Sequence, residues 1–329
     1  MNTPHPAPAL PPVLPPSPLD PEIKQFVDTV CAESRRLIAG RELGWPALRE
    51  IFEQARLPWR QGGPEMARSQ DIVADTQAGP VRLRIHDPAP GRNKPTLVYL
   101  HGGGWTIFSL DTHDRLMREY AHQGDLAVVG VDYALSPEVR YPVALEQCVA
   151  TVRWLEAHAA ELGLDAQRLA LGGDSAGAAL SFGTALKLRD AGEGHRVKAL
   201  LGNYGGFAPD YSDNARRRYG SPQDMLTADE VDMFWNNYVR GPADRTDPYA
   251  APLLAQLQGL PPVFLAIAEC DVLAEQNLLM AGRLLAAKVP VEAEVYAGAP
   301  HSFLEAMSIS QTARRAIADS AAWLRRVLD

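Results

Sequence analysis

The sequence predicts an α/β protein with a mostly parallel central sheet and helices on both faces. From residue 96 onward, short and almost wholly apolar segments alternate with longer segments of helical spacing. Apolar strands of this kind are typical of parallel sheets that are buried on both faces. Regular alternation of strands and helices is typical of α/β architecture. One long stretch interrupts the alternation, and we interpret it as part of a helical cap.

The elements can be assigned in chain order. Residues 71–75 and 81–85 flank a turn, and the second segment alternates apolar with basic side chains, which predicts a hairpin. The expected strands of the core are 96–100, 126–131, 168–171, 197–201, 263–268 and 291–296. The expected helices between and after them are 112–122, 143–160, 178–190, 274–287 and 312–328.

Two further helices are expected ahead of the sheet, at 21–39 and 46–56. Apolar side chains recur at helical spacing in the first of them, which has Pro21 at its start and Gly40 just past its end. Residues 1–20 are rich in proline and predict a flexible arm. We therefore expect a single domain over residues 21–329.

Residues 204–261 contain no convincing core strand but include a helical piece at 228–239. Insertions that follow the carboxyl end of a strand are a common place for lids and binding loops. We expect residues 21–60 and 204–250 to supply the cap.

Composition limits the classes of partner. The chain has 329 residues and a formal net charge of −8, which argues against binding to nucleic acid or to an anionic membrane. No apolar run is long enough to span a membrane. Cys31, Cys148 and Cys270 are too far apart for a zinc pattern and odd in number, so a reducing compartment is expected, the cytoplasm. The sequence leaves a homodimer open.

The pentapeptide Gly-Asp-Ser-Ala-Gly at 173–177 lies between an expected strand and an expected helix. This context predicts a nucleophile elbow, a sharp turn that exposes the hydroxyl of Ser175. The turn brings Gly173 and Gly177 together, where side chains would collide. The N–H of Ala176 would begin the helix without an intrahelical partner, and an oxyanion beside Ser175 could accept from it.

A second motif, His-Gly-Gly-Gly-Trp at 101–105, directly follows the strand 96–100. Glycines after a strand let backbone N–H groups approach a ligand, and such a loop supplies oxyanion donors. We expect Gly102 and Gly103 to donate together with Ala176. His101 precedes the serine in the chain, so we interpret it as a residue that orders the loop and not as the base.

The base and the acid are expected downstream, in the order serine, acid, histidine. Asp271 and His301 each follow an expected strand, so both should lie at the same sheet edge as Ser175. Glu269 and Glu275 are competing acids. Glu269 falls within the strand and Glu275 within the following helix, so Asp271 is preferred. The other histidines form no metal-ligand pattern, so neither a metal nor a cofactor is expected.

With these residues in hand, the chain resembles the hormone-sensitive-lipase-like serine esterases of the α/β-hydrolase fold, and within them bacterial acetyl esterases. The resemblance covers about residues 95–305. Two positions depart from the family pattern: Val272 stands where the acid is usually followed by proline, and Ser302 stands where glycine often follows the histidine. The matching stretches are 101–105, 110–115, 132–138, 141–142, 173–177, Asp271 and 301–304.

The resemblance implies hydrolysis of short-chain acyl esters, from acetyl to butyryl, on a small-molecule substrate. An amidase or aryl-formamide hydrolase could use the same triad. A small-ligand receptor of the same fold, or a scaffold that binds through the proline-rich arm, is a further alternative, although a receptor would not need all three triad residues. Four side chains flank the motifs and are candidates for the substrate pocket, with core packing as the equal alternative: Trp105, Tyr204, Phe207 and Leu273.

Overall fold

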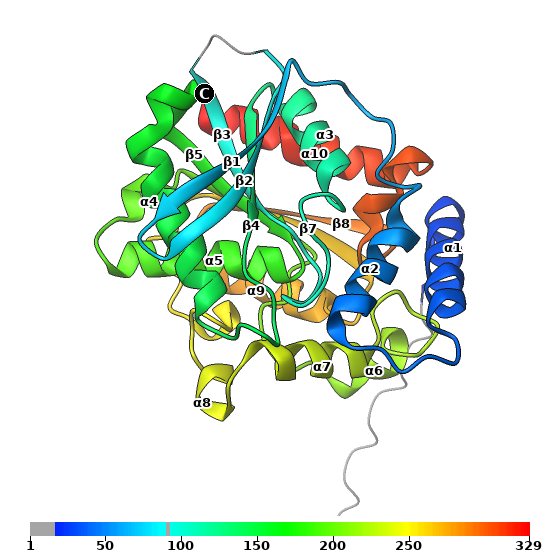
Figure 1. Ribbon diagram of the computed structural model, residues 1–329. Coiled ribbons are helices and arrows are strands. Elements are labelled where there is room, and N and C mark those ends of the chain that lie inside the picture. The colour runs from blue at the N-terminus through cyan, green and yellow to red at the C-terminus, as the bar shows by residue number, and fades with distance from the viewer. Residues whose placement is uncertain (1–16, 90–92) are drawn as a thin grey trace, which may run out of the picture.

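The core of the protein is one eight-stranded sheet with the strand order β1-β2-β4-β3-β5-β6-β7-β8 (Figure 1). The computed structural model describes residues 17–89 and 93–329. The strands are β1 (Arg68–Thr76), β2 (Gly79–Asp87), β3 (Lys94–Leu100), β4 (Ala127–Asp132), β5 (Leu164–Asp174), β6 (Ala199–Asn203), β7 (Val263–Cys270) and β8 (Val291–Pro300).

The strands β3 to β8 pair with one another in parallel, whereas the pairs β1–β2 and β2–β4 are antiparallel. The mostly parallel sheet is therefore confirmed. Successive side chains of a strand enter opposite layers, as the pleat requires. In β3, Val98 and Leu100 join one buried cluster, while Leu97 and Tyr99 join the other. Both faces of the strand are thus buried, which explains its continuous apolar sequence.

Helices cover the two faces of the sheet. The helices α4 (Val143–Leu162), α5 (Ala176–Asp190) and α9 (Ala274–Ala286) pack in one layer. The other layer contains α3 (Asp114–Gly124) and α10 (Gln311–Leu328). All five were expected from the sequence, with ends that differ by at most two residues.

The two N-terminal helices are α1 (Pro21–Ile38) and α2 (Trp45–Arg56). Asp20 caps α1 by accepting hydrogen bonds from the N–H groups of Glu22 and Ile23, which stabilises the first turn. The apolar stripe of α1 is buried against the layer that holds α10. Asp20 also donates its own N–H to Gly298 at 2.9 Å, so the chain is held to β8 where α1 begins. The expectation for residues 1–16 lies outside the described residues.

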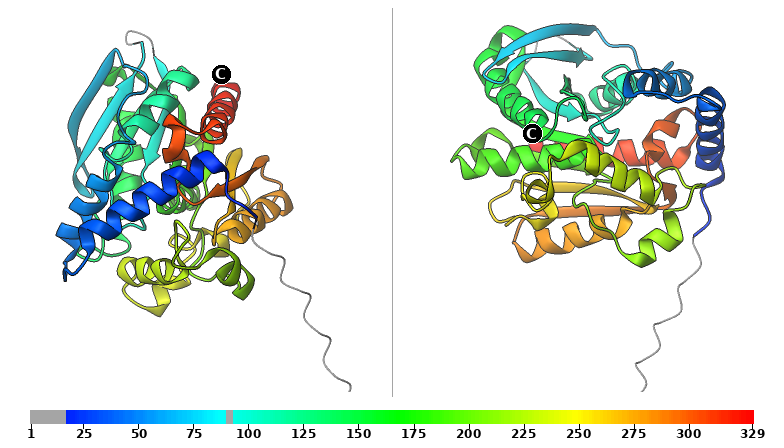
Figure 2. Two further views of the ribbon diagram at one scale, coloured as in Figure 1. Left: turned by 90° about the vertical axis from the view of Figure 1, so that its right-hand side faces the viewer. Right: turned by 60° about the horizontal axis from the view of Figure 1, so that its bottom comes forward.

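The segment between β6 and β7 carries α6 (Asp213–Tyr219), α7 (Ala228–Tyr238) and the short α8 (Pro242–Arg245), and no strand is assigned within it. Thr227 and Glu230 begin α7 with reciprocal side-chain to backbone hydrogen bonds, a capping box. Figures 1 and 2 show α6 and α7 at the same end of the molecule as α1 and α2.

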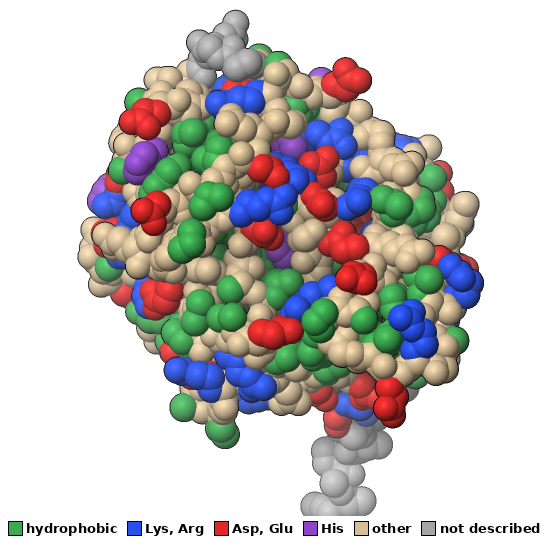
Figure 3. Space-filling model, in the orientation of Figure 1, with side chains coloured by type: hydrophobic (Ala, Val, Ile, Leu, Met, Phe, Trp, Pro, Cys, Tyr) green, Lys and Arg blue, Asp and Glu red, His purple; other side chains and the backbone are tan. Residues whose placement is uncertain are grey.

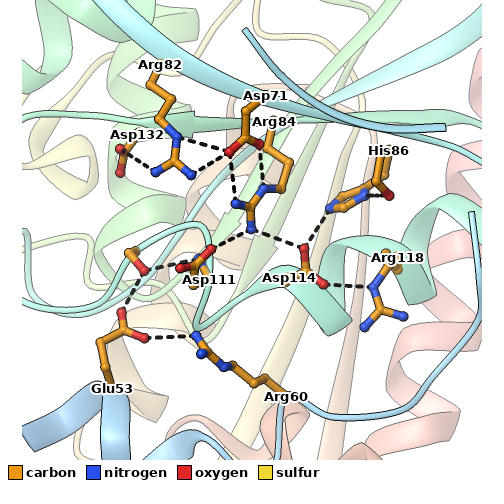
Figure 4. A network of polar contacts seen from close by, with 12 residues as sticks. Glu53, Arg60, Asp71, Arg82, Arg84, His86, Asp111, Asp114, Arg118 and Asp132 are labelled. Atoms are coloured by element: carbon orange, nitrogen blue, oxygen red, sulfur yellow. Dashed lines mark hydrogen bonds and ion pairs between the residues drawn. The ribbon is translucent and has the colours of Figure 1, made fainter. Parts of the chain in front are cut away.

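Charged side chains gather over the hairpin and the loop before α3 (Figure 3). Arg84 lies at the centre of this network, where its guanidinium pairs with Asp71, Asp111 and Asp114 (Figure 4). The hydrogen bonds from Arg84 lower the pKa of Asp71 to about 2. Glu53 of α2 accepts from Ser109 of the same loop. The network therefore ties α2, the hairpin and the loop 109–114 together beside the Gly-rich motif.

Candidate active site

Ser175 occupies the sharp turn between β5 and α5. Its φ is 54° and its ψ is −118°, a backbone conformation that costs a non-glycine residue energy. The Ser175 N–H donates to the Asn203 carbonyl oxygen at 2.9 Å, which holds the turn against β6. Strain of this kind persists only where the surrounding structure enforces it.

The two outer glycines of the motif are fixed by the neighbouring strand. A Cβ on Gly173 would lie 2.2 Å from the carbonyl oxygen of Leu100, and a Cβ on Gly177 would lie 1.8 Å from the same atom. The structure thus bears out the expectation that side chains would collide here. In addition, the atom that an added side chain would meet first belongs to the backbone of β3, because both glycines lie against the carbonyl oxygen of Leu100.

Three side chains at the carboxyl ends of β5, β7 and β8 form a chain of hydrogen bonds. The His301 Nε2 lies 2.9 Å from the Ser175 Oγ. The His301 Nδ1 lies 2.7 Å from the Asp271 Oδ2, and the Leu273 N–H donates to the Asp271 Oδ1 at 3.0 Å. The structure therefore brings the three residues expected as nucleophile, base and acid within direct reach of one another. This is the geometry that general-base activation of a serine requires.

The competing acids are engaged elsewhere. Glu269 accepts from the Gly298 N–H at 2.8 Å and from the Ser17 hydroxyl. Glu275 accepts from the Asn214 side chain. Neither forms a hydrogen bond with His301, so the geometry favours Asp271.

His101 has a different environment from His301. Its Nδ1 lies 2.7 Å from the Gly102 carbonyl oxygen, and its ring stacks on Tyr133 with centroids 4.4 Å apart. Burial lowers the pKa of His101 to about 3, so the ring is neutral at physiological pH. This agrees with a residue that orders the Gly-rich loop.

The structure corrects one of the three expected oxyanion donors. The Gly102 N–H donates to the Asp174 Oδ1 at 3.1 Å and is therefore occupied. Gly103 and Gly104 line the cavity at Ser175, and their φ values are +107° and +57°. Within the described residues, neither N–H has a hydrogen-bond partner in the protein. Gly104 was not expected from the sequence, because three consecutive glycines do not reveal which N–H a buried carboxylate will take.

Asp174, the residue before Ser175, holds the Gly-rich loop in place through its carboxylate. Besides Gly102, it accepts from the Tyr99 hydroxyl at 2.9 Å, and its Oδ2 lies 3.2 Å from the His113 Nε2. Burial acts to raise the pKa of Asp174, but His113, together with Tyr99 and His101, outweighs burial and leaves that pKa below its usual value. Burial acts to lower the pKa of His113, and Asp174 reverses this, so that pKa is raised. Each of the two buried side chains thus favours the charged form of the other.

Asp174→Asn is expected to lower the free energy of unfolding by about 3 kcal/mol near neutral pH, because it leaves one partner of a buried pair without the other. The raised pKa of His113 means that the pair loses its contribution as pH rises through that value. The lowered pKa of Asp174 means that it is also lost at acid pH, well below about 4. Urea unfolding across pH checks this. A difference between wild type and variant that does not change with pH would contradict the ion pair.

A cavity of about 250 Å³ opens at the serine and the histidine. Its walls come from α1, α2, the Gly-rich loop and the segment 222–234, which includes the start of α7. The lining residues include Val30, Ile38, Phe52, Arg56, Ile107, Phe108, Met225, Phe234, Ser175 and His301. Both segments expected as cap elements therefore contribute to the wall above Ser175.

The four side chains expected in the substrate pocket lie elsewhere, and that prediction is wrong. Trp105 stacks on Tyr238 with centroids 4.2 Å apart. Phe207 packs on Phe182, and Leu273 is buried in the same layer. Tyr204 is buried with its ring 5.0 Å from that of His301, so it supports the base from behind. None of the four lines the cavity at Ser175.

Two properties of the described residues concern metal binding and membrane spanning. That part of the chain has no cluster of three or more His, Cys, Asp or Glu side chains that could hold a metal ion. Among the helices at 17–89 and 93–329, none has the length and apolar character needed to cross a membrane.

Comparison with known proteins identifies a matching family, similar sequences and similar structures. Residues 97–305 match the model of a family described as alpha/beta hydrolase fold. An acetyl esterase of Salmonella paratyphi B is 36% identical over 288 residues, which covers 84% of this chain and 87% of that protein. The structure of a hyperthermophilic esterase from the archaeon Pyrobaculum calidifontis superimposes with a TM-score of 0.88 at 33% identity, covering 94% of this chain and 98% of that one. A thermophilic carboxylesterase cloned from a metagenomic library gives a TM-score of 0.83 at 30% identity, with 87% and 98% coverage.

Proposed function

Since the chain belongs to the alpha/beta hydrolase fold family, we propose that it is a serine carboxylesterase that hydrolyses short-chain acyl esters. The resemblance to hormone-sensitive-lipase-like esterases is confirmed by the family match and by the acetyl esterase relatives. The observation that carries the proposal is the hydrogen-bond chain Ser175–His301–Asp271, which opens on a cavity beside unpartnered backbone N–H groups.

In the proposed mechanism, Ser175 Oγ attacks the ester carbonyl while His301 Nε2 takes its proton. The Asp271 carboxylate holds the imidazole in the tautomer that leaves Nε2 free to accept, and it stabilises the imidazolium that forms. His301 then donates the proton to the leaving alcohol. Water attacks the acyl-enzyme in turn, with His301 again as the base.

The proposed oxyanion donors are the N–H groups of Gly103, Gly104 and Ala176. Ala176 begins α5, where N–H groups have no intrahelical partner and the helix dipole favours negative charge. Removing one such donor typically costs about 3 kcal/mol of transition-state stabilisation. The glycine positions themselves resist substitution, because a Cβ on Gly104 would lie 2.2 Å from the Phe234 ring.

We further propose that residues 21–60 and 204–250 act as a cap. The contribution of α1, α2 and the segment 222–234 to the cavity wall supports this division. A cavity of about 250 Å³ whose wall includes side chains from both segments suits a small acyl group better than a long chain. The names of the acetyl esterase relatives favour the same class of substrate.

A series of p-nitrophenyl esters from acetyl to dodecanoyl tests the acyl preference. We expect kcat/KM to peak between acetyl and butyryl and to fall beyond, because longer chains must displace the side chains of the cap. Release of p-nitrophenol measures the rate, and the matching anilides serve as amide controls. A maximum at long acyl chains would overturn the short-acyl proposal. Faster hydrolysis of the anilides would replace it by an amidase.

A further inference from the structure

One buried charge lines the cavity at Ser175. Among the described residues of its wall, four carry a charge: Arg35, Arg56, Asp224 and Glu230. Only Arg56, at the end of α2, is buried, with 6% of its surface exposed. Burial removes much of the water around a guanidinium, so partners within the protein or from a ligand are favoured at its donors.

Part of the Arg56 guanidinium is held by the protein. Its Nε donates to the Glu305 Oε2 at 2.9 Å, and its central carbon lies 4.2 Å from the centre of the Phe108 ring. Glu305 is itself 8% exposed and belongs to the short helix that follows His301. One edge and one face of the guanidinium are therefore fixed, and the charge is neutralised by the adjacent carboxylate.

The contact with Glu305 uses only the Nε of Arg56 and leaves its two Nη amino groups to be accounted for. Over residues 17–89 and 93–329, neither Nη atom makes a hydrogen bond within the protein, although the residue lines the cavity. The acidic residues of the wall are engaged: Asp224 binds Ser221, and Glu230 closes the capping box at Thr227. Neither Nη atom is fully buried, so both reach open space. Arg56 also lines a hollow of only about 10 Å³ beside Trp59 and His113, so the cavity at Ser175 is the one with room for a ligand at these donors.

The position of Arg56 relates it to the reacting centre. Its guanidinium rests on Phe108, and the Phe108 ring packs against Gly103, where an added Cβ would lie 2.8 Å from a ring carbon. One aromatic ring thus separates Arg56 from a proposed oxyanion donor. Arg56 and Gly103 line the same cavity, so a substrate that fills it meets both on its wall.

We infer that Arg56 selects esters that carry a second, uncharged oxygen acceptor, such as an ether, hydroxyl or carbonyl oxygen, in the part of the molecule that lies along α2. An uncharged acceptor fits because Glu305 already neutralises the guanidinium, so a carboxylate would leave net negative charge in a buried place. The inference rests on the proposed ester hydrolysis and names the substrate class for that site. Arg56 acts on binding and selectivity, while the triad performs the chemistry.

The test compares two acetate esters of the same shape, 2-methoxyethyl acetate and butyl acetate, which differ by one oxygen in place of one CH₂. Rates are divided by those of hydroxide hydrolysis to remove intrinsic reactivity. We expect the wild-type chain to favour the methoxy ester in kcat/KM by about tenfold, the size typical of a hydrogen bond to a charged donor. Arg56→Met should bring this ratio to about one. Arg56→Lys, which can still pair with Glu305 but lacks the planar fork, should give an intermediate value.

The ratio is informative even where a variant is less stable, because a damaged fold lowers both rates alike. Arg36→Met removes an exposed arginine of α1 that pairs with Glu33 and should keep the wild-type ratio. A ratio near one in the wild-type chain, or one that survives in Arg56→Met, would overturn the inference and leave ester hydrolysis standing. A preference for monoethyl succinate over both neutral esters would also overturn it, in favour of an anionic substrate.

If the chain hydrolyses neither ester, the proposed function fails, and the inference is then judged on binding alone. Calorimetry of the two esters with the wild-type chain and with Arg56→Met gives the ratio of Kd values. An arginine-dependent preference for the methoxy ester supports the acceptor site, and equal Kd values reject it.

Discussion

Replacing Ser175 with alanine is expected to lower kcat for p-nitrophenyl acetate by a factor on the order of 10⁶, the loss found when the nucleophile of a serine triad is removed. The reason is that the hydroxyl which His301 would deprotonate, 2.9 Å from its Nε2, no longer exists. The residual rate comes from binding and the oxyanion donors alone. The burst of p-nitrophenol that marks acyl-enzyme formation should vanish with it.

The control for Ser175→Ala is a measurement of its stability against urea. The Ser175 hydroxyl contacts His301, and the N–H of residue 175 still reaches the Asn203 carbonyl in the alanine variant. We therefore expect the urea midpoint to match that of wild type. A folded Ser175→Ala protein that keeps more than a tenth of the wild-type kcat would place the nucleophile elsewhere.

Replacing Asp271 with asparagine is expected to lower kcat by about 10⁴, as in other triads in which the carboxylate becomes an amide. The Asp271 Oδ2 accepts from the His301 Nδ1 at 2.7 Å, and its Oδ1 accepts from the Leu273 N–H. An amide that keeps the Leu273 contact presents its NH₂ to the imidazole. The ring then carries its proton on Nε2 and cannot act as a base. Ester hydrolysis as a function of pH measures the loss.

Glu269→Gln is the matched control, because Glu269 lies two residues away and was the competing acid. It bonds Gly298 and Ser17 and makes no hydrogen bond to His301. We expect its kcat to stay within tenfold of wild type. A larger loss in Glu269→Gln than in Asp271→Asn would reverse the assignment of the acid.

Much of this site could be predicted from the sequence, because the catalytic geometry is built on sheet order. Ser175, Asp271 and His301 follow three expected strands, and parallel strands end at one edge, so residues 126 positions apart come into contact. Alternation of strands and helices carries that information in the sequence itself. The same reasoning found α1, whose apolar spacing and Pro21 match the structure.

The oxyanion loop and the pocket wall could not be predicted in the same way. Gly102 loses its N–H to Asp174, a contact between segments 72 positions apart that depends on how the loop turns. Trp105 and Phe207 flank motifs in the chain, but their rings enter the core. Beside the motif residues, much of the actual wall is supplied by Phe52 and other residues of helices remote from every motif. No periodic signal encodes which helix will face a given loop.

The packing of α1 has a consequence for the growing polypeptide. Ile23 and Phe26 are buried in the same cluster as Phe303 and Leu304, so α1 rests on a part of the chain that is made about 280 positions later. At a synthesis rate of about 5–20 residues per second, roughly tens of seconds separate the two. Throughout that interval part of the apolar stripe of α1 lacks its final cover, although Trp59 can already pack on Phe26. A chain that stops before His301 lacks the proposed base. It also lacks Phe303 and Leu304, so the apolar side chains of α1 that pack on them would stay exposed.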